Sequence, residues 1–264
     1  MPIARLASRA LIAVEGADAR PFLHNLLTQD VESLEPGDLR FGALLSPPGR
    51  LLFDLFLLGV EDGVVLDVSA DRRDALMQRL SMYKLRAKVK ISPDPRPVFA
   101  SWPEAADGFT ADPRNSLLGG RRYGEAVADA TELDYHAHRL SLGVPDPTHD
   151  APQDKTYPIE ANFDLLNGID FQKGCFVGQE TTSRMKRRGA IKNRMMPLTF
   201  DGPPPAFGAE VLKGELRAGE VLTGRDGVVM ALLRVDRIDG DLTIDGRLVS
   251  LRRPSWMAEG LPNA

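Results

Sequence analysis

The 264-residue sequence has one cysteine, Cys175, and lacks the motifs by which the commonest enzyme classes are identified. A single thiol cannot form an internal disulfide, which fits a reducing compartment. No CxxC pair or HExxH segment is present, and this excludes the usual zinc sites. Walker-type phosphate loops, GxGxxG and GxSxG segments are also missing. The histidines show no ligand spacing and are interpreted as solvent-facing or internally hydrogen-bonded groups: His24, His136, His138 and His149.

Long apolar runs and an excess of positive charge are absent as well. The longest apolar run, residues 51–60, is interrupted by Asp54 and is far shorter than the roughly 20 residues that cross a bilayer. The first residues lack the apolar core of a secretory signal. We therefore expect no membrane span and a cytoplasmic location. The formal net charge of -4 gives the whole chain no electrostatic reason to bind nucleic acid directly.

The hydrophobic periodicity that is present predicts an α+β fold. A strand and a helix are expected within residues 10–27, and three strand-like runs with Pro-Gly and Asp-Gly turns predict an antiparallel meander over 39–69. A helix at 71–86 and further strands follow. After the proline run near residue 201, short strands separated by glycine turns are typical of a small β-barrel. We place a domain boundary there, between 1–200 and 201–264.

Cys175 lies in the segment FQKGCFVGQE, residues 171–180. The ordinary interpretation is that a lone cysteine is a small buried hydrophobe. The neighbouring Lys173 would instead favour the thiolate. Gly174 and Gly178 permit a tight loop before a helix whose N-terminus stabilises an anion. The residues alone leave both interpretations open.

A basic run follows this segment. Its six cations would attract a polyanion, such as a phosphate-bearing ligand, a polyglutamyl tail or an RNA backbone. A solvated charged face is the ordinary alternative. The run comprises Arg184, Lys186, Arg187, Arg188, Lys192 and Arg194.

Two carboxylates interrupt apolar segments. Asp54 lies within LLFDLFLL, so it must be paired, be hydrogen-bonded or face a cavity, although a strand with one polar face explains it equally well. Glu160 could accept two N–H bonds from a heterocycle edge such as that of a pterin. Alternatively, Glu160 is an ordinary acid in the first turn of a helix that runs through Leu165 and Leu166.

As a set, these segments resemble a known family. KGCFVGQE resembles the signature K-G-C-Y/F-x-G-Q-E of the YgfZ-type folate-binding proteins, relatives of the glycine cleavage T protein that act in iron-sulfur cluster assembly or repair. Retention of Asp54, which enteric YgfZ proteins often lack, makes the chain more similar to the mitochondrial branch. Four further segments match the family in order: EGADARPFLHNLLTQDV, SPPGRLLFDLFL, YKLRAKV and YPIEANFDLLNGIDF.

The resemblance implies a fold and a set of site residues. The fold is a ring around a folate-sized hole, made of a T-protein-like α+β domain, a ferredoxin-like insert at about 46–125 and a C-terminal β-barrel. Function is expected to depend on Cys175, with Lys173 beside it. Asp54 and Glu160 correspond to residues that contact tetrahydrofolate in T proteins, and the chain departs from the T-protein pattern at Asn162, where those proteins have glycine. The folate-binding residues expected in full are Asp54, Glu160, Arg184 and Arg188.

The resemblance predicts a tetrahydrofolate-binding accessory factor for iron-sulfur cluster assembly or repair in client enzymes, including radical enzymes of tRNA thiomodification. One thiol cannot hold a cluster alone, since four ligands are usual. Cys175 would therefore share a transient cluster with a partner such as an A-type carrier, or react by thiol exchange or reduction. The alternatives are a folate-dependent aminomethyltransferase or other one-carbon enzyme, and an interaction module in which Cys175 is structural. Whether the chain is itself an enzyme stays open.

Overall fold

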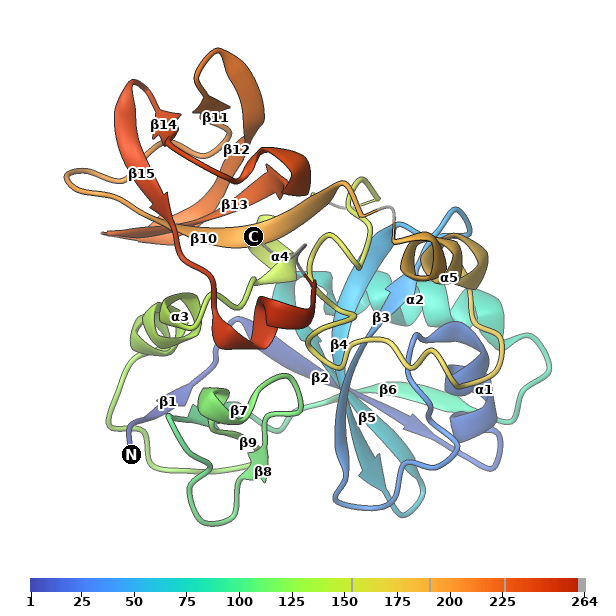
Figure 1. Ribbon diagram of the computed structural model, residues 1–264. Coiled ribbons are helices and arrows are strands. Elements are labelled where there is room, and N and C mark those ends of the chain that lie inside the picture. The colour runs from blue at the N-terminus through green and yellow to red at the C-terminus, as the bar shows by residue number, and fades with distance from the viewer. Residues whose placement is uncertain (153, 190, 226, 261–264) are drawn as a thin grey trace.

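The computed structural model describes residues 1–152, 154–189, 191–225 and 227–260. Three parts are visible in Figure 1: a five-stranded sheet, a four-stranded sheet and a closed barrel. Two helices, α3 (Glu132–Ser141) and α4 (Pro147–Asp150), lie where these parts meet. No helix among the residues that the structure describes has the length and apolar character needed to span a bilayer.

The five-stranded sheet is antiparallel with the order β3-β4-β5-β2-β6. The predicted meander is confirmed, because β4 pairs with both β3 and β5. Helices α1 (Ala19–Leu26) and α2 (Arg73–Lys84) cover one face, where Leu23 and Leu80 are fully buried. A short 3-10 helix, η1 (Ala70–Arg72), precedes α2. The strands are β2 (Arg9–Glu15), β3 (Leu39–Leu45), β4 (Leu51–Val60), β5 (Gly63–Ser69) and β6 (Lys90–Asp94).

The second sheet has the order β1-β7-β9-β8. Its strands are β1 (Ile3–Arg5), β7 (Val98–Ser101), β8 (Thr110–Ala111) and β9 (Gly120–Tyr123), with the 3-10 helix η2 (Ser116–Leu118) between the last two. Strands of the expected insert, 46–125, are divided between the two sheets. β4 and β5 pair within the first sheet, whereas β7 pairs with β1 from the N-terminus.

The barrel closes in the order β10-β13-β12-β11-β14-β15. It begins before the boundary expected near residue 201, because β10 pairs with β13 along its whole length. The barrel interior contains buried apolar side chains such as Leu198, Val221 and Ile244. The strands are β10 (Asn193–Thr199), β11 (Glu210–Lys213), β12 (Leu216–Arg225), β13 (Val228–Arg234), β14 (Leu242–Ile244) and β15 (Arg247–Leu251), with 3-10 helices η3 (Val235–Arg237) and η4 (Ser255–Gly260).

The segment between α4 and the barrel joins the parts. Its Phe163 ring lies 4.7 Å from that of Phe41 on β3, and Met195 and Met230 of the barrel belong to the same buried cluster. The helix expected through Leu165 and Leu166 is not formed, and this stretch consists of turns. Asn162 and Asn167 have positive φ values of 61° and 54°, which interrupt a right-handed helix. The helix that follows Cys175 is α5 (Gln179–Arg188).

Candidate functional site

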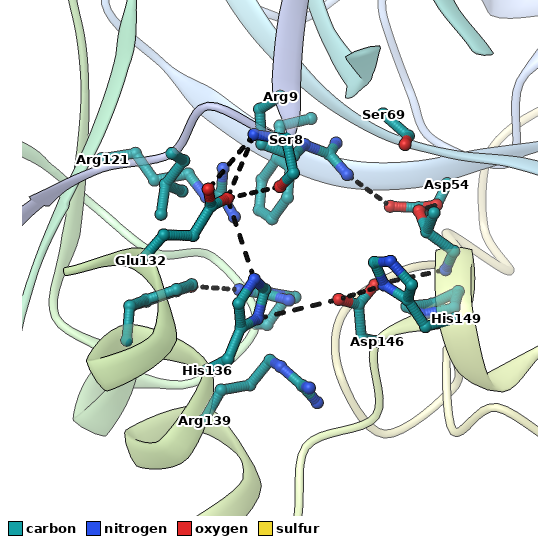
Figure 2. A pocket seen from close by; sticks show the side chains of 16 residues that line it. Ser8, Arg9, Asp54, Ser69, Arg121, Glu132, His136, Arg139, Asp146 and His149 are labelled. Carbon is teal, nitrogen blue, oxygen red and sulfur yellow. Dashed lines mark hydrogen bonds and ion pairs between the residues drawn. The ribbon is translucent and has the colours of Figure 1, made fainter. Parts of the chain in front are cut away.

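Asp54 lies in a small chamber between the five-stranded sheet and helices α3 and α4 (Figure 2). The cavity volume is about 30 Å³. The chamber is strongly polar, since its lining residues include Arg9, Asp54, Glu132, His136, Asp146 and His149.

The Asp54 carboxylate is buried and fully engaged. The residue is 5% exposed, Oδ2 lies 3.1 Å from Arg9 Nη1, and Oδ1 accepts a hydrogen bond of 3.1 Å from Thr148 Oγ1. Of the three expectations for Asp54, paired, hydrogen-bonded or facing a cavity, each is met. Thr148 belongs to α4, so one hydrogen bond connects the sheet to the opposite wall of the chamber.

Behind Asp54, the chamber wall is a buried network of arginines and aspartates. Arg9 Nε lies 2.6 Å from Asp67 Oδ1, and Arg121 Nη1 lies 2.7 Å from Asp67 Oδ2. Arg114 Nη2 lies 2.7 Å from Asp112 Oδ2. Burial alone would lower the pKa of Arg121, but Asp67 and the other nearby acidic groups raise it well above its usual value. These guanidinium groups are therefore charged, neutralised by carboxylates and held rigidly.

The opposite wall is a chain of acids and histidines, as Figure 2 shows. His136 lies 3.8 Å from Glu132 and 3.8 Å from Asp146, and His149 Nδ1 lies 3.1 Å from Asp146. Burial acts to raise the pKa of Asp146, but the hydrogen bond with His149 and the charge of Arg139 lower it overall. The same hydrogen bond raises the pKa of His149. Sequence reasoning did not assign His136 or His149 to a site, because their spacing carries no ligand signal.

A second, open cavity of about 400 Å³ adjoins the chamber. It shares Glu132, His136 and Asp146 with the chamber and extends to Thr223 and Arg225 on β12 of the barrel. The open cavity has room for a small molecule, and the polar chamber beside it supplies placed polar groups of the kind that orient ligands.

Cys175 is exposed, so the interpretation of it as a buried hydrophobe is wrong. Its loop is anchored on both sides of the thiol. Lys173 Nζ donates hydrogen bonds to the carbonyls of His24 and, at 2.7 Å, Leu27, which lie at the C-terminal end of α1. Burial lowers the pKa of Lys173 to about 8. On the other side, Phe176 is buried in the cluster that joins the sheet to the barrel. The thiol is thus presented to solvent by a fixed backbone.

The cysteine loop also packs closely on the turn between β3 and β4. Gly178, at the N-cap of α5, has φ +81°, and a Cβ atom there would lie 2.8 Å from Gly49 Cα and 2.8 Å from the carbonyl oxygen of Ser46. Neither backbone group can move away without disturbing the turn. Glycine is therefore required for both conformation and space.

We expect Gly178→Ala to lower the free energy of unfolding by about 1–3 kcal/mol through backbone strain and contact with the turn. Urea denaturation followed by circular dichroism measures this loss. Gly189→Ala is the matched control, because Gly189 is also left-handed, with φ +60°, but no atom lies within 4 Å of its added Cβ. Equal losses in both variants would show that the packing on the turn contributes nothing.

Glu160 lies outside the Asp54 chamber, and its carboxylate has internal partners. Oε2 accepts a hydrogen bond of 2.9 Å from the backbone N–H of Tyr157, and Oε1 accepts one of 3.0 Å from Asn193 Nδ2. It is absent from the described linings of both cavities. Asn162 departs from the glycine of T proteins at a position with positive φ, a conformation that asparagine tolerates better than most residues.

The basic run does not form a single exposed face. Arg194 is 1% exposed and lies 2.9 Å from Asp164, so it belongs neither to a solvated charged face nor to a surface that could attract a polyanion. Arg184 is exposed on α5 and lies 3.9 Å from Glu180, outside the described lining of the chamber. The side chain of Arg188 lies outside the described residues. Within the described ranges, no group of three or more His, Cys, Asp and Glu residues is placed to hold a metal ion.

Sequence comparisons identify relatives across the chain. A family model described as the CAF17 C-terminal beta-barrel domain matches residues 192–259. The mitochondrial iron-sulfur cluster assembly factor IBA57 of Mus musculus is 32% identical over 301 residues, covering 96% of this chain and 84% of the relative. The Homo sapiens protein of the same name is 32% identical over 299 residues, with the same coverage.

Structural comparison agrees with the expected fold. The glycine cleavage system aminomethyltransferase T from Bartonella henselae matches with a TM-score of 0.75 over 97% of this chain and 86% of the other, at 19% sequence identity. The prediction of a T-protein-like fold with a C-terminal β-barrel is confirmed.

The cytoplasmic location expected from the sequence is wrong, because the relatives are named as mitochondrial proteins and point to the mitochondrion. The lack of an apolar secretory signal does not distinguish a cytoplasmic from a mitochondrial location. Mitochondrial targeting segments are amphipathic and arginine-rich rather than apolar.

Proposed function

The chain belongs to the IBA57 family of iron-sulfur cluster assembly factors, and from this premise we propose that it binds a tetrahydrofolate against Asp54 and offers the Cys175 thiol to a cluster on a partner protein. The observation that carries the proposal is the exposed thiol of Cys175 on a loop fixed by Lys173 and Phe176. A fixed, exposed thiol can reach a partner without first unfolding its surroundings.

In this proposal the cluster is cargo that the chain shares with its partner. An iron-sulfur cluster usually needs four ligands, and Cys175 supplies one. The partner, an A-type carrier or a client enzyme, would supply the others. Radical enzymes of tRNA thiomodification are among the clients we propose. The exposed cations of α5, Arg184 and Lys186, lie close behind the cysteine loop in sequence and would attract an acidic partner surface.

Tetrahydrofolate fits the residues of the two cavities in part. Asp54 offers a carboxylate to ring N–H groups, and the open cavity has room for the remainder of the molecule. Arg139, 6% exposed, lines both cavities and would attract an anionic group of the ligand. Glu160 is left out of the proposed site, since it is absent from the described linings of both cavities.

We expect Asp54→Asn to weaken binding of 5-formyltetrahydrofolate at least about tenfold, because a hydrogen bond to a charged group contributes roughly 1.5–3 kcal/mol. Isothermal titration calorimetry measures the dissociation constant. Glu160→Gln is the matched control and should leave it unchanged. Equal weakening by both substitutions, or by the control alone, would contradict the assignment of the ligand to the Asp54 chamber.

Anaerobic reconstitution with ferrous iron and sulfide tests the shared cluster. Cluster absorbance on this chain should require the presence of an A-type carrier, and a stable cluster on the isolated chain would count against sharing. An assay for aminomethyl transfer from a lipoyl carrier to tetrahydrofolate tests the one-carbon alternative. Turnover in that assay would overturn the assembly mechanism proposed for the thiol.

A further inference from the structure

The chamber at Asp54 is narrow, although it adjoins the open cavity. Its volume of about 30 Å³ corresponds to the space of one water molecule, which is far too small for a pterin ring. Both oxygens of Asp54 already have partners, Arg9 and Thr148. A pterin can therefore reach Asp54 only if one wall of the chamber moves and one of these contacts is exchanged.

Two of the three walls are rigid. Asp54 and Arg9 lie on β4 and β2, whose strands are paired on both sides within the five-stranded sheet. Helix α3 has ten residues and begins with a capping box, in which Thr131 and Asp134 exchange hydrogen bonds. Its Tyr135 is buried in the cluster under the second sheet. Neither wall offers a low-energy opening.

The third wall, α4, is a single turn of four residues between irregular segments. Such a short helix has little stability of its own, and its position depends on side-chain contacts. Toward the chamber it is held by the hydrogen bond from Thr148 to Asp54 and by the contact of its N-cap residue, Asp146, with His136 on α3. The contact of Thr148 is the one that a ligand at Asp54 would replace.

On its other side, α4 is attached to the barrel. The carboxylate of Asp150 is completely buried, and Oδ1 accepts hydrogen bonds from the backbone N–H of Thr223, at 3.0 Å, and from the Thr223 hydroxyl. Oδ2 accepts a bond of 2.7 Å from the N–H of Asp146. Losing the Thr148 contact would therefore leave α4 bound to β12 of the barrel rather than free.

We propose that α4 is a gate over Asp54 and that its occupant is the pterin ring of a reduced folate. In the closed state the Thr148 hydroxyl donates to Asp54 Oδ1. In the open state a ring N–H donates to the same oxygen, and α4 remains attached to the barrel through Asp150. Thr148 is thus a positioning residue that competes with the ligand. This inference rests on the folate binding proposed above.

The test is Thr148→Val, which keeps the shape of the side chain and removes its donor. We expect this variant to bind 5-formyltetrahydrofolate about fivefold more tightly than the wild type. The Thr148 hydroxyl no longer competes with the ligand for Asp54 Oδ1, and this competition amounts to one net hydrogen bond. In the absence of ligand, backbone amides of residues 146–151 should exchange with deuterium faster than in the wild type. Thr148→Ser, which retains the hydroxyl, should behave as wild type in both measurements.

Thr199→Val is the matched control, because it removes a hydroxyl that bonds Ser250 on the barrel. It should change neither the dissociation constant nor the exchange of residues 146–151. If the wild type binds folate and Thr148→Val binds it equally or more weakly, the gate is overturned and the proposed folate function stands. If no folate binds to the wild type or to the variant, the proposed folate function is overturned, and the proposed gate is overturned with it.

Discussion

Replacing Asp67 with alanine is expected to lower the free energy of unfolding by about 3–5 kcal/mol, because removal of one partner leaves buried charges uncompensated. Asp67 is 1% exposed and lies within 2.7 Å of both Arg9 and Arg121. Arg121 is stacked 3.6 Å from the Phe56 ring and cannot turn to solvent without uncovering it. Two guanidinium groups would therefore lose their main counter-charge while they remain buried.

The loss can be measured by urea denaturation, with Asp239→Ala as the matched control. Asp239 lies 3.1 Å from Arg253, but its side chain is 70% exposed, and exposed ion pairs contribute little. Arg9 also holds Asp54, so Asp67→Ala should additionally weaken folate binding in protein that still folds. A stability loss no larger than that of the control would show that the buried network contributes specificity of structure rather than stability.

The sequence allowed correct predictions where one residue type has few acceptable environments. An aspartate inside the apolar strand β4 cannot be buried alone, so a partner or a cavity could be expected for Asp54 before its position was known. The paired glycines of the cysteine segment likewise indicated a tight loop, and Gly178 has the positive φ that such a loop needs. These inferences depend on local chemistry, which the sequence contains.

The other walls of the chamber could not be predicted in this way. His136 and His149 face the same cavity from α3 and α4, on the side opposite β4. Their contact with the Asp54 chamber arises from packing between segments far apart in sequence. Neither histidine has a spacing or a neighbour that signals a site, and only the assembled fold brings them to it.

The predictions for Arg194 and Glu160 inferred the location of each side chain from its charge. Arg194 was grouped with exposed cations, yet β10 carries it into the interior, where it meets Asp164. Glu160 was expected to begin a helix or to hold a pterin, but left-handed Asn162 ends any helix there, and the carboxylate binds Tyr157 N–H and Asn193. The place of Arg194 is decided by strand pairing, which outweighs local propensity, whereas the helix expected after Glu160 is prevented by the backbone conformation of Asn162.

Replacing Cys175 with serine should strongly reduce the contribution of this chain to cluster assembly while leaving its fold and folate binding unchanged. Cys175 is exposed, so the substitution should alter the free energy of unfolding by no more than about 0.5 kcal/mol. It is absent from the described linings of both cavities next to Asp54. A serine hydroxyl does not replace a thiolate as a metal ligand. Loss of a residue that only supports a metal ligand already lowers metal affinity or activity by about 10- to 100-fold. Loss of the ligand itself should therefore lower cluster transfer on the order of 100-fold.

Cluster transfer should depend on the position of the thiol in the structure as well as on its presence. The double variant Cys175→Ser with Ser183→Cys moves the thiol onto α5, where Ser183 is half-buried and lacks the support that Lys173 and Phe176 give the loop. Transfer of cluster from a loaded carrier to an apo client, followed by client activity, should stay as low in this variant as in Cys175→Ser. Recovery in the double variant would mean that the chain acts as a general thiol source, because the anchored loop would then have no role in directing the thiol to its partner.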